Sequence, residues 1–289
     1  LTMFARKPAP IQVQAWGQPF GSGMEAMDYV LGDAIVFPED QRQFFTEEIY
    51  DLPCCLAFPP PPAAPLVMPL PADRNGFVTF GSFNRLTKIS STALRLWADL
   101  LSRLPDARLL AKDPALDDSG ARRWFLDSLG ALGVAADRIE LRGKTSQEEH
   151  FAAYSEADIA LDPIPNTGGA TTFGCCWMGL PVVTLLDRRP SGRISASLLS
   201  AIGLDEFVAQ SEAEFIDIAS SLARDTARLR SMRQDLRDRL KNSILCDHRT
   251  YTDTVETAYR GFWRRWCLAY DTNIQVRTNQ PGAAPVVPY

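Results

Sequence analysis

Apolar and polar positions follow two repeating patterns through the middle of the chain. Between residues 75 and 210, short apolar runs of strand length alternate with segments whose apolar residues recur at three- and four-residue steps. In the first such segment Leu94, Trp97, Leu101 and Leu104 share one helical face, and Ser90 or Ser91 precedes them as a helix cap. The pattern predicts strands at residues 77–80, 107–111, 138–141, 158–161, 181–185 and 206–209, with helices after Ser90 or Ser91 and at residues 119–132, 147–156, 171–178 and 193–202.

This alternation indicates the fold class. Strands joined by helical crossovers pair in parallel, and the helices cover both faces of the sheet. We therefore expect an α/β fold with a doubly wound, Rossmann-like parallel sheet over about residues 75–210.

The flanking segments lack this pattern. Residues 1–52 carry mixed signals, and the proline-rich residues 58–65 predict an extended linker, with a domain boundary within residues 58–75. After residue 210 we expect charged helices at residues 211–222 and 225–241, an aromatic-rich helix at 251–266 and a loose tail at 273–289.

Composition narrows the range of functions. The 289 residues include 30 basic and 35 acidic side chains, a net charge of −5 that disfavours sequence-independent binding to nucleic acid. No apolar run is long enough to span a membrane, and the first residues do not resemble a secretory signal. The six cysteines form no CxxC motif, and adjacent pairs such as Cys54 and Cys55 suit neither a zinc site nor a disulfide. We therefore expect free thiols, a cytoplasmic location and no metal site.

Candidate chemistry lies in loops that follow predicted strands, because open α/β sheets bind ligands at the carboxyl ends of their strands. Residues 81–88 place Asn84 and two cations, Arg85 and Lys88, after the first strand, where an anion would bind. A merely solvated loop is an equally good interpretation of this segment.

A second loop, residues 162–172, opens a helix. Gly168 and Gly169 let the backbone approach a ligand closely, and Thr171 and Thr172 add hydroxyls beside the free N–H groups of the helix start. This predicts a phosphate site, with a simple turn as the alternative. The chain has neither a Walker motif nor a GxGxxG sequence, which weakens the case for ATP hydrolysis and for NAD binding.

A third loop, residues 143–150, contains Ser146 and Glu149 at the spacing of a capping box. His150 then lies one turn into the helix, near the ligand edge of the sheet. Stacking on a base and a purely structural role are both open for this histidine.

Two of these loops and one further segment together resemble one family. Residues 80–89, the Gly-Gly-x-Thr-Thr helix start at residues 168–172 and residues 177–184 are similar to the catalytic region of bacterial O-linked N-acetylglucosamine (O-GlcNAc) transferases, which are glycosyltransferases with the GT-B fold. The resemblance runs from residues 8–12 to about residue 266. It implies a second lobe that binds a UDP-sugar and a final helix that returns to the first lobe.

The resemblance also implies roles for individual residues. Lys88 matches the catalytic lysine that neutralises the donor diphosphate, a task that needs no metal or other cofactor. His150 matches the residue that packs against uracil, and Gly17 and Pro19 match a loop that lines the sugar pocket from the first lobe. The remaining donor-binding residues implied are Asn84, Arg85, Gly168, Gly169, Ala170, Thr171 and Thr172.

The chain departs from the family pattern at several positions, among them Arg85, Gln147 and Ala153, and two further departures bear directly on function. Gly174 stands where family members carry an acidic residue that holds the ribose hydroxyls. A sugar- and acceptor-binding Asp-Phe-x-x-His-Pro segment and helical TPR repeats would lie before Leu1. The expected organisation is therefore a partial acceptor-side lobe with linker at residues 1–70, a nucleotide-sugar-binding lobe at 71–245, a C-terminal helix at 246–270 and a loose tail at 271–289.

These observations lead to a main hypothesis and to alternatives. The resemblance implies an inverting glycosyltransferase that moves N-acetylglucosamine from UDP-GlcNAc to Ser or Thr of a protein acceptor, with TPR repeats as a further partner. A degenerate lobe that binds a nucleotide or a protein without catalysis is the alternative, favoured by the loss of the acidic residue at Gly174. A nucleotide-sugar epimerase shares the fold, but no carboxylates cluster at the predicted strand ends to support it.

Overall fold

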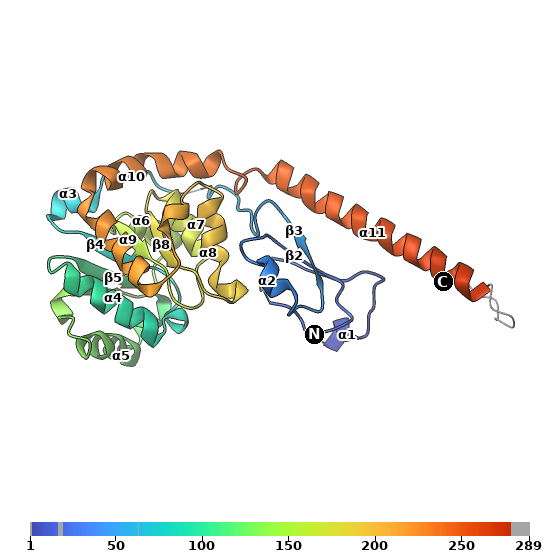
Figure 1. Ribbon diagram of the computed structural model, residues 1–289. Coiled ribbons are helices and arrows are strands. Elements are labelled where there is room, and N and C mark those ends of the chain that lie inside the picture. Colours follow the sequence, from blue (N-terminus) through green and yellow to red (C-terminus); the bar gives the residue numbers. More distant parts are fainter. Residues whose placement is uncertain (1, 17–19, 63, 279–289) are drawn as a thin grey trace.

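The computed structural model describes residues 2–16, 20–62 and 64–278, which form two lobes and a long C-terminal helix (Figure 1). The larger lobe contains a six-stranded parallel sheet in the order β6-β5-β4-β7-β8-β9. Its strands are β4 (Thr79–Ser82), β5 (Arg108–Lys112), β6 (Ile139–Arg142), β7 (Ile159–Leu161), β8 (Val182–Leu185) and β9 (Val208–Ala209).

Helices connect these strands and cover both faces of the sheet. The chain leaves β4 first towards β6 and later towards β9, and right-handed crossovers in opposite directions put their helices on opposite faces. The helices are α3 (Pro71–Asn75), α4 (Ser91–Arg103), α5 (Ser119–Gly130), α6 (Gln147–Tyr154), α7 (Ala170–Trp177), α8 (Ile194–Ser200), α9 (Glu212–Arg224) and α10 (Thr226–Lys241), with short 3₁₀ turns at Leu86–Lys88, Pro114–Asp117, Ala136–Arg138, Pro190–Gly192 and Asp205–Phe207.

Local sequence signals explain where several helices begin. The side chains of Ser90, Asp118 and Ser211 each accept a backbone N–H at the start of α4, α5 and α9. Ser146 and Glu149 form the expected capping box at the start of α6. The apolar face of α4 is buried in the core with Trp97 fully enclosed, which accounts for the helical periodicity of its sequence.

The smaller lobe is built on a three-stranded parallel sheet in the order β1-β2-β3. Its elements are α1 (Thr2–Ala5), β1 (Val13–Gln14), β2 (Tyr29–Gly32), α2 (Glu39–Arg42) and β3 (Glu48–Asp51). The proline-rich segment that follows runs extended to the larger lobe, where the N–H of Phe58 donates to Leu245 O (2.8 Å) and its ring stacks on Phe173.

Helix α11 (His248–Thr278) leaves the larger lobe and passes along the smaller sheet (Figure 1). Tyr251, Val255, Ala258 and Phe262 are buried against that sheet, and Phe262 stacks on Tyr29 of β2 with ring centroids 3.7 Å apart. The first half of the helix therefore packs on the first lobe.

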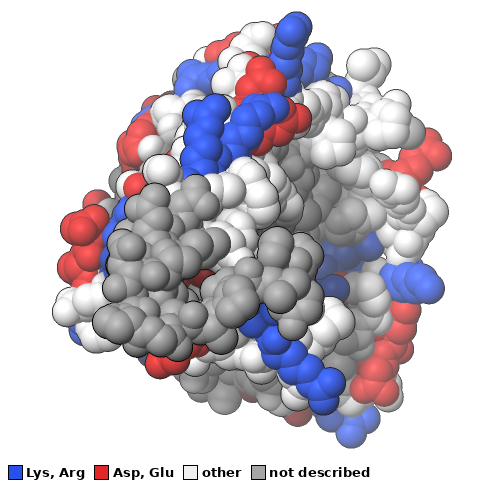
Figure 2. Space-filling view, turned by 90° about the vertical axis from the view of Figure 1, so that its right-hand side faces the viewer, with Lys and Arg blue, Asp and Glu red and all other residues white. Residues whose placement is uncertain are grey.

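The surface carries charges of both signs. On the face that holds the first lobe and the far end of α11, Lys and Arg side chains are interspersed with Asp and Glu (Figure 2). Among the described helices, none has the length and apolar character to cross a membrane.

The doubly wound parallel sheet expected from the sequence is confirmed, with each predicted strand and helix of residues 75–210 present within a few residues of its expected bounds. The expectation of a loose tail from residue 271 or 273 is wrong for its first part, because α11 continues to Thr278. The first proline beyond Phe262 is Pro281, so no residue in between interrupts a helix that packing has already nucleated. Residues 279–289 lie outside the described part of the chain.

Candidate donor-binding site

The candidate site lies where the sheet order reverses, between β4 and β7. Open α/β sheets bind ligands at the carboxyl ends of their strands at this switch point. The loop after β4 carries Asn84, Arg85 and Lys88, and the loop after β7 leads from Asp162 into α7. The structure thus brings together two of the three loops expected from the sequence.

Lys88 is held over the loop that precedes α7. Its Nζ donates a hydrogen bond to Thr167 O (2.6 Å), and an isolated bridge pairs Ile89 with Pro165. Burial lowers the pKa of Lys88, nearby Arg85 lowers it further, and the carboxylate of Asp162 opposes both effects. The half-buried ammonium is therefore fixed beside the glycine pair rather than extended into solvent.

The start of α7 is open for an anion. Gly169 is the N-cap residue and has no side chain to cap the helix, and Ala170 at the first helical position is exposed. The aligned N–H groups of a helix start attract negative charge. Gly168 is needed beneath them because a Cβ there would overlap the hydroxyl of Thr172.

Buried polar contacts support this helix start. The Gly168 N–H donates to Asp162 Oδ1 (2.8 Å), and the hydroxyls of Thr172 and Ser195 share a hydrogen bond (2.8 Å). Asn84 is buried and lines a small cavity together with Asp162, Thr171 and Thr172. The bonds of Asp162 and Thr172 therefore hold the glycine pair in place before any ligand binds.

His150 lies on α6, and its Nε2 forms a hydrogen bond with the hydroxyl of Tyr154 (2.9 Å). Burial and the charge of Lys112 lower the pKa of His150, so its imidazole is neutral near pH 7. A neutral, half-buried ring has the flat apolar face that packs against a base. The Tyr154 ring in turn contacts Phe83 in an edge arrangement, with ring centroids 4.5 Å apart, which connects His150 to the loop after β4.

Not every expected residue joins the cluster. The side chain of Arg85 is exposed at the start of the 3₁₀ turn, and Ala170 is exposed at the first position of α7. Gly17 and Pro19, expected to line a sugar pocket, lie outside the described residues.

Three residues near the site carry roles that the sequence did not reveal. Asp162 holds the Gly168 N–H, Tyr154 holds His150, and Lys112 is buried at the end of β5 with its Nζ donating to Gly143 O (3.1 Å). A polar residue directly after an apolar strand is a signal that could have identified Asp162 and Lys112. Tyr154 stands four residues after His150 on the same helix, and this spacing places both side chains on one face, which is also a signal in the sequence.

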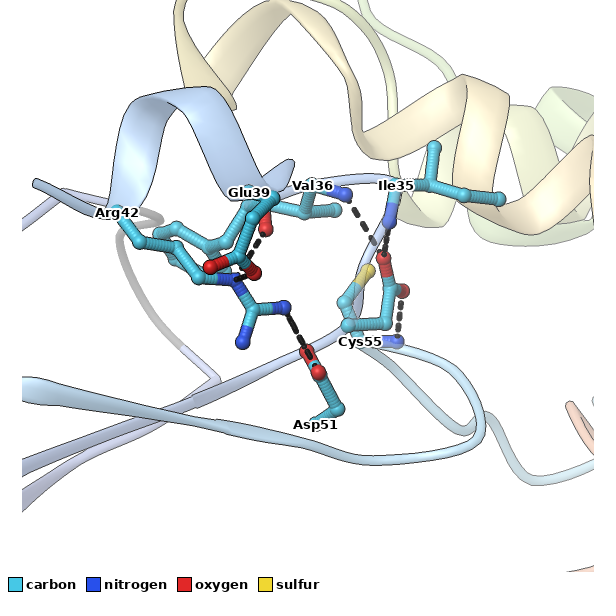
Figure 3. Close-up of polar contacts among 8 residues, drawn as sticks. Ile35, Val36, Glu39, Arg42, Asp51 and Cys55 are labelled. Carbon is cyan, nitrogen blue, oxygen red and sulfur yellow. Dashed lines mark hydrogen bonds and ion pairs between the residues drawn. The ribbon is translucent and has the colours of Figure 1, made fainter.

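One group of metal-ligand side chains occurs within the described ranges, away from these loops. The carboxylate of Asp33 and the thiols of Cys54 and Cys55 lie within 4.8 Å of one another. The Asp33 oxygens already accept the N–H groups of Ile35, Val36 and Cys55, as Figure 3 shows for the three backbone donors. A hydroxyl, that of Ser197, also donates to Asp33, so this carboxylate has a structural explanation without a metal.

Comparisons with known proteins agree with this geometry. A model of glycosyl transferase family 41 matches residues 2–56 and 69–255. A probable UDP-N-acetylglucosamine–peptide N-acetylglucosaminyltransferase SPINDLY from Solanum lycopersicum is 39% identical over 269 residues, which are 92% of this chain and 29% of that protein. A probable transferase of the same activity named SEC, from Arabidopsis thaliana, is 27% identical over 277 residues, 92% of this chain and 28% of that protein.

Solved structures of glycosyltransferases match the fold of this chain. A mutant of the O-GlcNAc transferase from Thermobaculum terrenum superposes with a TM-score of 0.86 at 37% identity, covering 92% of this chain and 51% of that one. A sucrose-phosphate synthase from Thermosynechococcus elongatus matches in fold alone, with a TM-score of 0.56 at 14% identity over 83% of this chain and 60% of that one. The expected GT-B type fold and the resemblance to the O-GlcNAc transferase catalytic region are confirmed. The chain spans less than a third of the length of these plant relatives and about half of the bacterial structure.

Proposed function

Since the chain belongs to glycosyl transferase family 41, we propose that it is the donor-binding part of an inverting transferase that moves N-acetylglucosamine from UDP-GlcNAc to Ser or Thr of proteins. The observation that carries this proposal is the position of Lys88, whose ammonium is fixed 2.6 Å from Thr167 O beside the open start of α7. A cation and a helix start on one side of a loop form a site for a diphosphate.

In this proposal the residues act on the leaving group. As the bond between sugar and phosphate breaks, negative charge grows on the diphosphate, and Lys88 and the N–H groups at the start of α7 stabilise that charge. The backbone at Gly169 and Ala170 and the hydroxyl of Thr171 would orient the phosphates, and neutral His150 would pack against the base. The similarity to probable UDP-N-acetylglucosamine–peptide N-acetylglucosaminyltransferases of Solanum lycopersicum and Arabidopsis thaliana supports UDP-GlcNAc as the donor and a peptide as the acceptor.

We expect this chain to bind UDP and Lys88→Ala to weaken that binding. The loss of a charge-assisted contact costs about 1.5–3 kcal/mol, or roughly ten- to a hundred-fold in affinity. Calorimetric titration measures the change, with GDP titrated alongside to test the preference for the base. Lys241→Ala, which removes an exposed lysine on α10, is the matched control and should bind like the parent. Equal affinity in Lys88→Ala and the parent would remove the support for the diphosphate role.

We also expect UDP binding to need no divalent metal. Lys88 and the start of α7 supply the positive charge that a bound cation otherwise provides. Titration in excess chelator should reproduce the affinity measured without it. An affinity that falls in chelator and returns with magnesium or manganese would contradict this assignment of Lys88.

The alternative of a non-catalytic lobe has one specific observation in its favour. Gly174 offers no carboxylate to the ribose, and a Cβ added there would lie 3.2 Å from the Tyr154 hydroxyl. Transfer to a Ser- and Thr-containing peptide by the full-length protein distinguishes the two functions. UDP binding without transfer from UDP-GlcNAc would favour the binding lobe.

A further inference from the structure

Asp162 is the buried acid beneath the candidate site. It follows β7 directly, and only 1% of it is exposed. Its Oδ1 accepts the N–H of Gly168 (2.8 Å), and its Oδ2 accepts the hydroxyl of Thr184 on β8 (2.8 Å). A charged carboxylate this deep in the protein requires nearby compensation.

That compensation comes first from these hydrogen bonds, and the cation of the site adds to it. The ammonium of Lys88 and the carboxylate of Asp162 interact electrostatically across the loop that joins β7 to α7. Both groups also hold the same stretch of this loop, since Lys88 donates to Thr167 O and Asp162 accepts from the next residue, Gly168. One carboxylate therefore affects both the backbone of the glycine pair and the charge of the lysine.

We propose that Asp162 is a positioning residue of the donor site, which fixes the Gly168 backbone and keeps the Lys88 ammonium charged. The inference rests on the proposed function, because it concerns how this chain holds a nucleoside diphosphate. Asp162 acts through Lys88 and Gly168 and is itself buried beneath them.

The charged and titratable groups around Lys88 and Asp162 decide in which direction the pKa of each is shifted. Arg85 and Asp162 act on Lys88, and burial is the largest influence, lowering its pKa. Burial likewise raises the pKa of Asp162, while hydrogen bonds from Ser195, Thr184 and Gly168 and the charge of Lys88 lower it. The thiols of Cys175 and Cys176 on α7 also lie near Asp162, and burial raises the pKa of both, so they stay neutral.

The direction of the expected change in the pKa of Lys88 follows from the loss of the Asp162 carboxylate charge. Without it, burial and Arg85 act on Lys88 unopposed, and the pKa of Lys88 falls further. The lysine then loses its proton at a lower pH, and diphosphate binding is lost earlier as the pH rises. At the acid end Lys88 is charged in every variant, and removal of a negative charge beneath an anion site does not weaken binding there.

The test is the pH dependence of UDP affinity in Asp162→Asn, measured by calorimetry between about pH 6 and about pH 10. Asparagine keeps the shape and an oxygen for the Gly168 N–H. We expect affinity equal to or above that of the parent at the acid end and an alkaline loss displaced towards lower pH. A displacement of about one unit would give about five-fold weaker binding at the parent's midpoint. The uracil base also titrates in this range, so the pH dependence of UDP affinity is compared between variants and not interpreted for one variant alone.

Two matched variants separate charge from packing. Thr184→Val removes the hydrogen bond to Oδ2 but keeps the carboxylate, and it should lose UDP at the same pH as the parent. Lys88→Arg replaces the titrating ammonium by a guanidinium that stays charged, so adding Asp162→Asn to it should no longer move the alkaline loss. Superimposable profiles for Asp162→Asn and the parent, or the same displacement in both lysine and arginine backgrounds, would overturn the proposal.

A measurement on the unmodified protein covers the case in which Asp162→Asn does not fold. In protein labelled with carbon-13 at the lysine side chains, the Lys88 resonance should show a second inflection at acid pH, when Asp162 takes up its proton. A Lys88 resonance whose position does not change through the acid range would contradict the coupling between Lys88 and Asp162.

If the parent binds no UDP at all, the proposed function fails. UDP binding that depends on Lys88 but not on the charge of Asp162 refutes this inference alone.

Discussion

At the scale of single residues, the contact between Gly174 and Tyr154 changes the expectation for the ribose. The family resemblance implies that a carboxylate placed at Gly174 would hold the ribose hydroxyls, provided that the pocket has room. In the structure the Tyr154 hydroxyl, which also bonds to His150, lies 3.2 Å from the position that a Cβ on Gly174 would take. A side chain at position 174 would therefore occupy space that the Tyr154 hydroxyl now fills.

We expect Gly174→Asp alone to give no gain in UDP affinity, because the new side chain displaces the Tyr154 hydroxyl and disturbs His150. Relative to Tyr154→Phe, the double variant Gly174→Asp with Tyr154→Phe should bind UDP more tightly. The gain should be about 1 kcal/mol, or roughly five-fold, since a carboxylate can accept hydrogen bonds from both ribose hydroxyls. Calorimetric titration of the three variants measures it.

The control for this prediction is a ligand without the hydroxyls. With 2′,3′-dideoxyuridine diphosphate the gain of the double variant should vanish. A double variant that is folded and binds UDP no better than Tyr154→Phe would mean that another group holds the ribose.

At the scale of elements, the sequence predicted most of the larger lobe. Its strands and helices were readable because short apolar runs alternate with segments of helical periodicity and because capping residues such as Ser90 and Ser146 mark helix starts. The end of α11 was not readable in this way. Its apolar pattern weakens after Trp266, yet the helix continues to Thr278 because nothing between these residues stops it.

The candidate site was predicted at the level of loops but not of hydrogen bonds. Lys88 and the glycine pair are local features, visible in one stretch of sequence. The bonds of Asp162 to Thr184 and of Thr172 to Ser195 join residues 22 and 23 positions apart. They depend on the register of β7 against β8 and on where α8 begins, which the sequence pattern does not specify.

At the scale of the whole molecule, Asp33 joins the two lobes. Its oxygens accept the backbone N–H groups of Ile35 (2.9 Å), Val36 (2.8 Å) and Cys55 (2.6 Å), which fix the turn after β2 and the segment after β3 (Figure 3). The hydroxyl of Ser197 on α8 of the larger lobe donates to the same carboxylate. One buried side chain thus connects three segments, two of them in the smaller lobe and one in the larger.

We expect Asp33→Ala to destabilise the protein by about 3 kcal/mol or more, because each buried donor left without an acceptor costs about 1–3 kcal/mol. Urea unfolding measures this change. Hydrogen exchange should accelerate both near residues 29–36 and near residues 194–200, since the carboxylate holds segments of both lobes. Ser197→Ala is the matched control: it removes one of the hydrogen bonds between the lobes and leaves the three backbone donors of Asp33 paired, so its cost should be about 1 kcal/mol. If Asp33→Ala and Ser197→Ala cost the same, the backbone contacts of Asp33 contribute little, and the lobes are held together mainly by α11 and the buried apolar side chains at their junction.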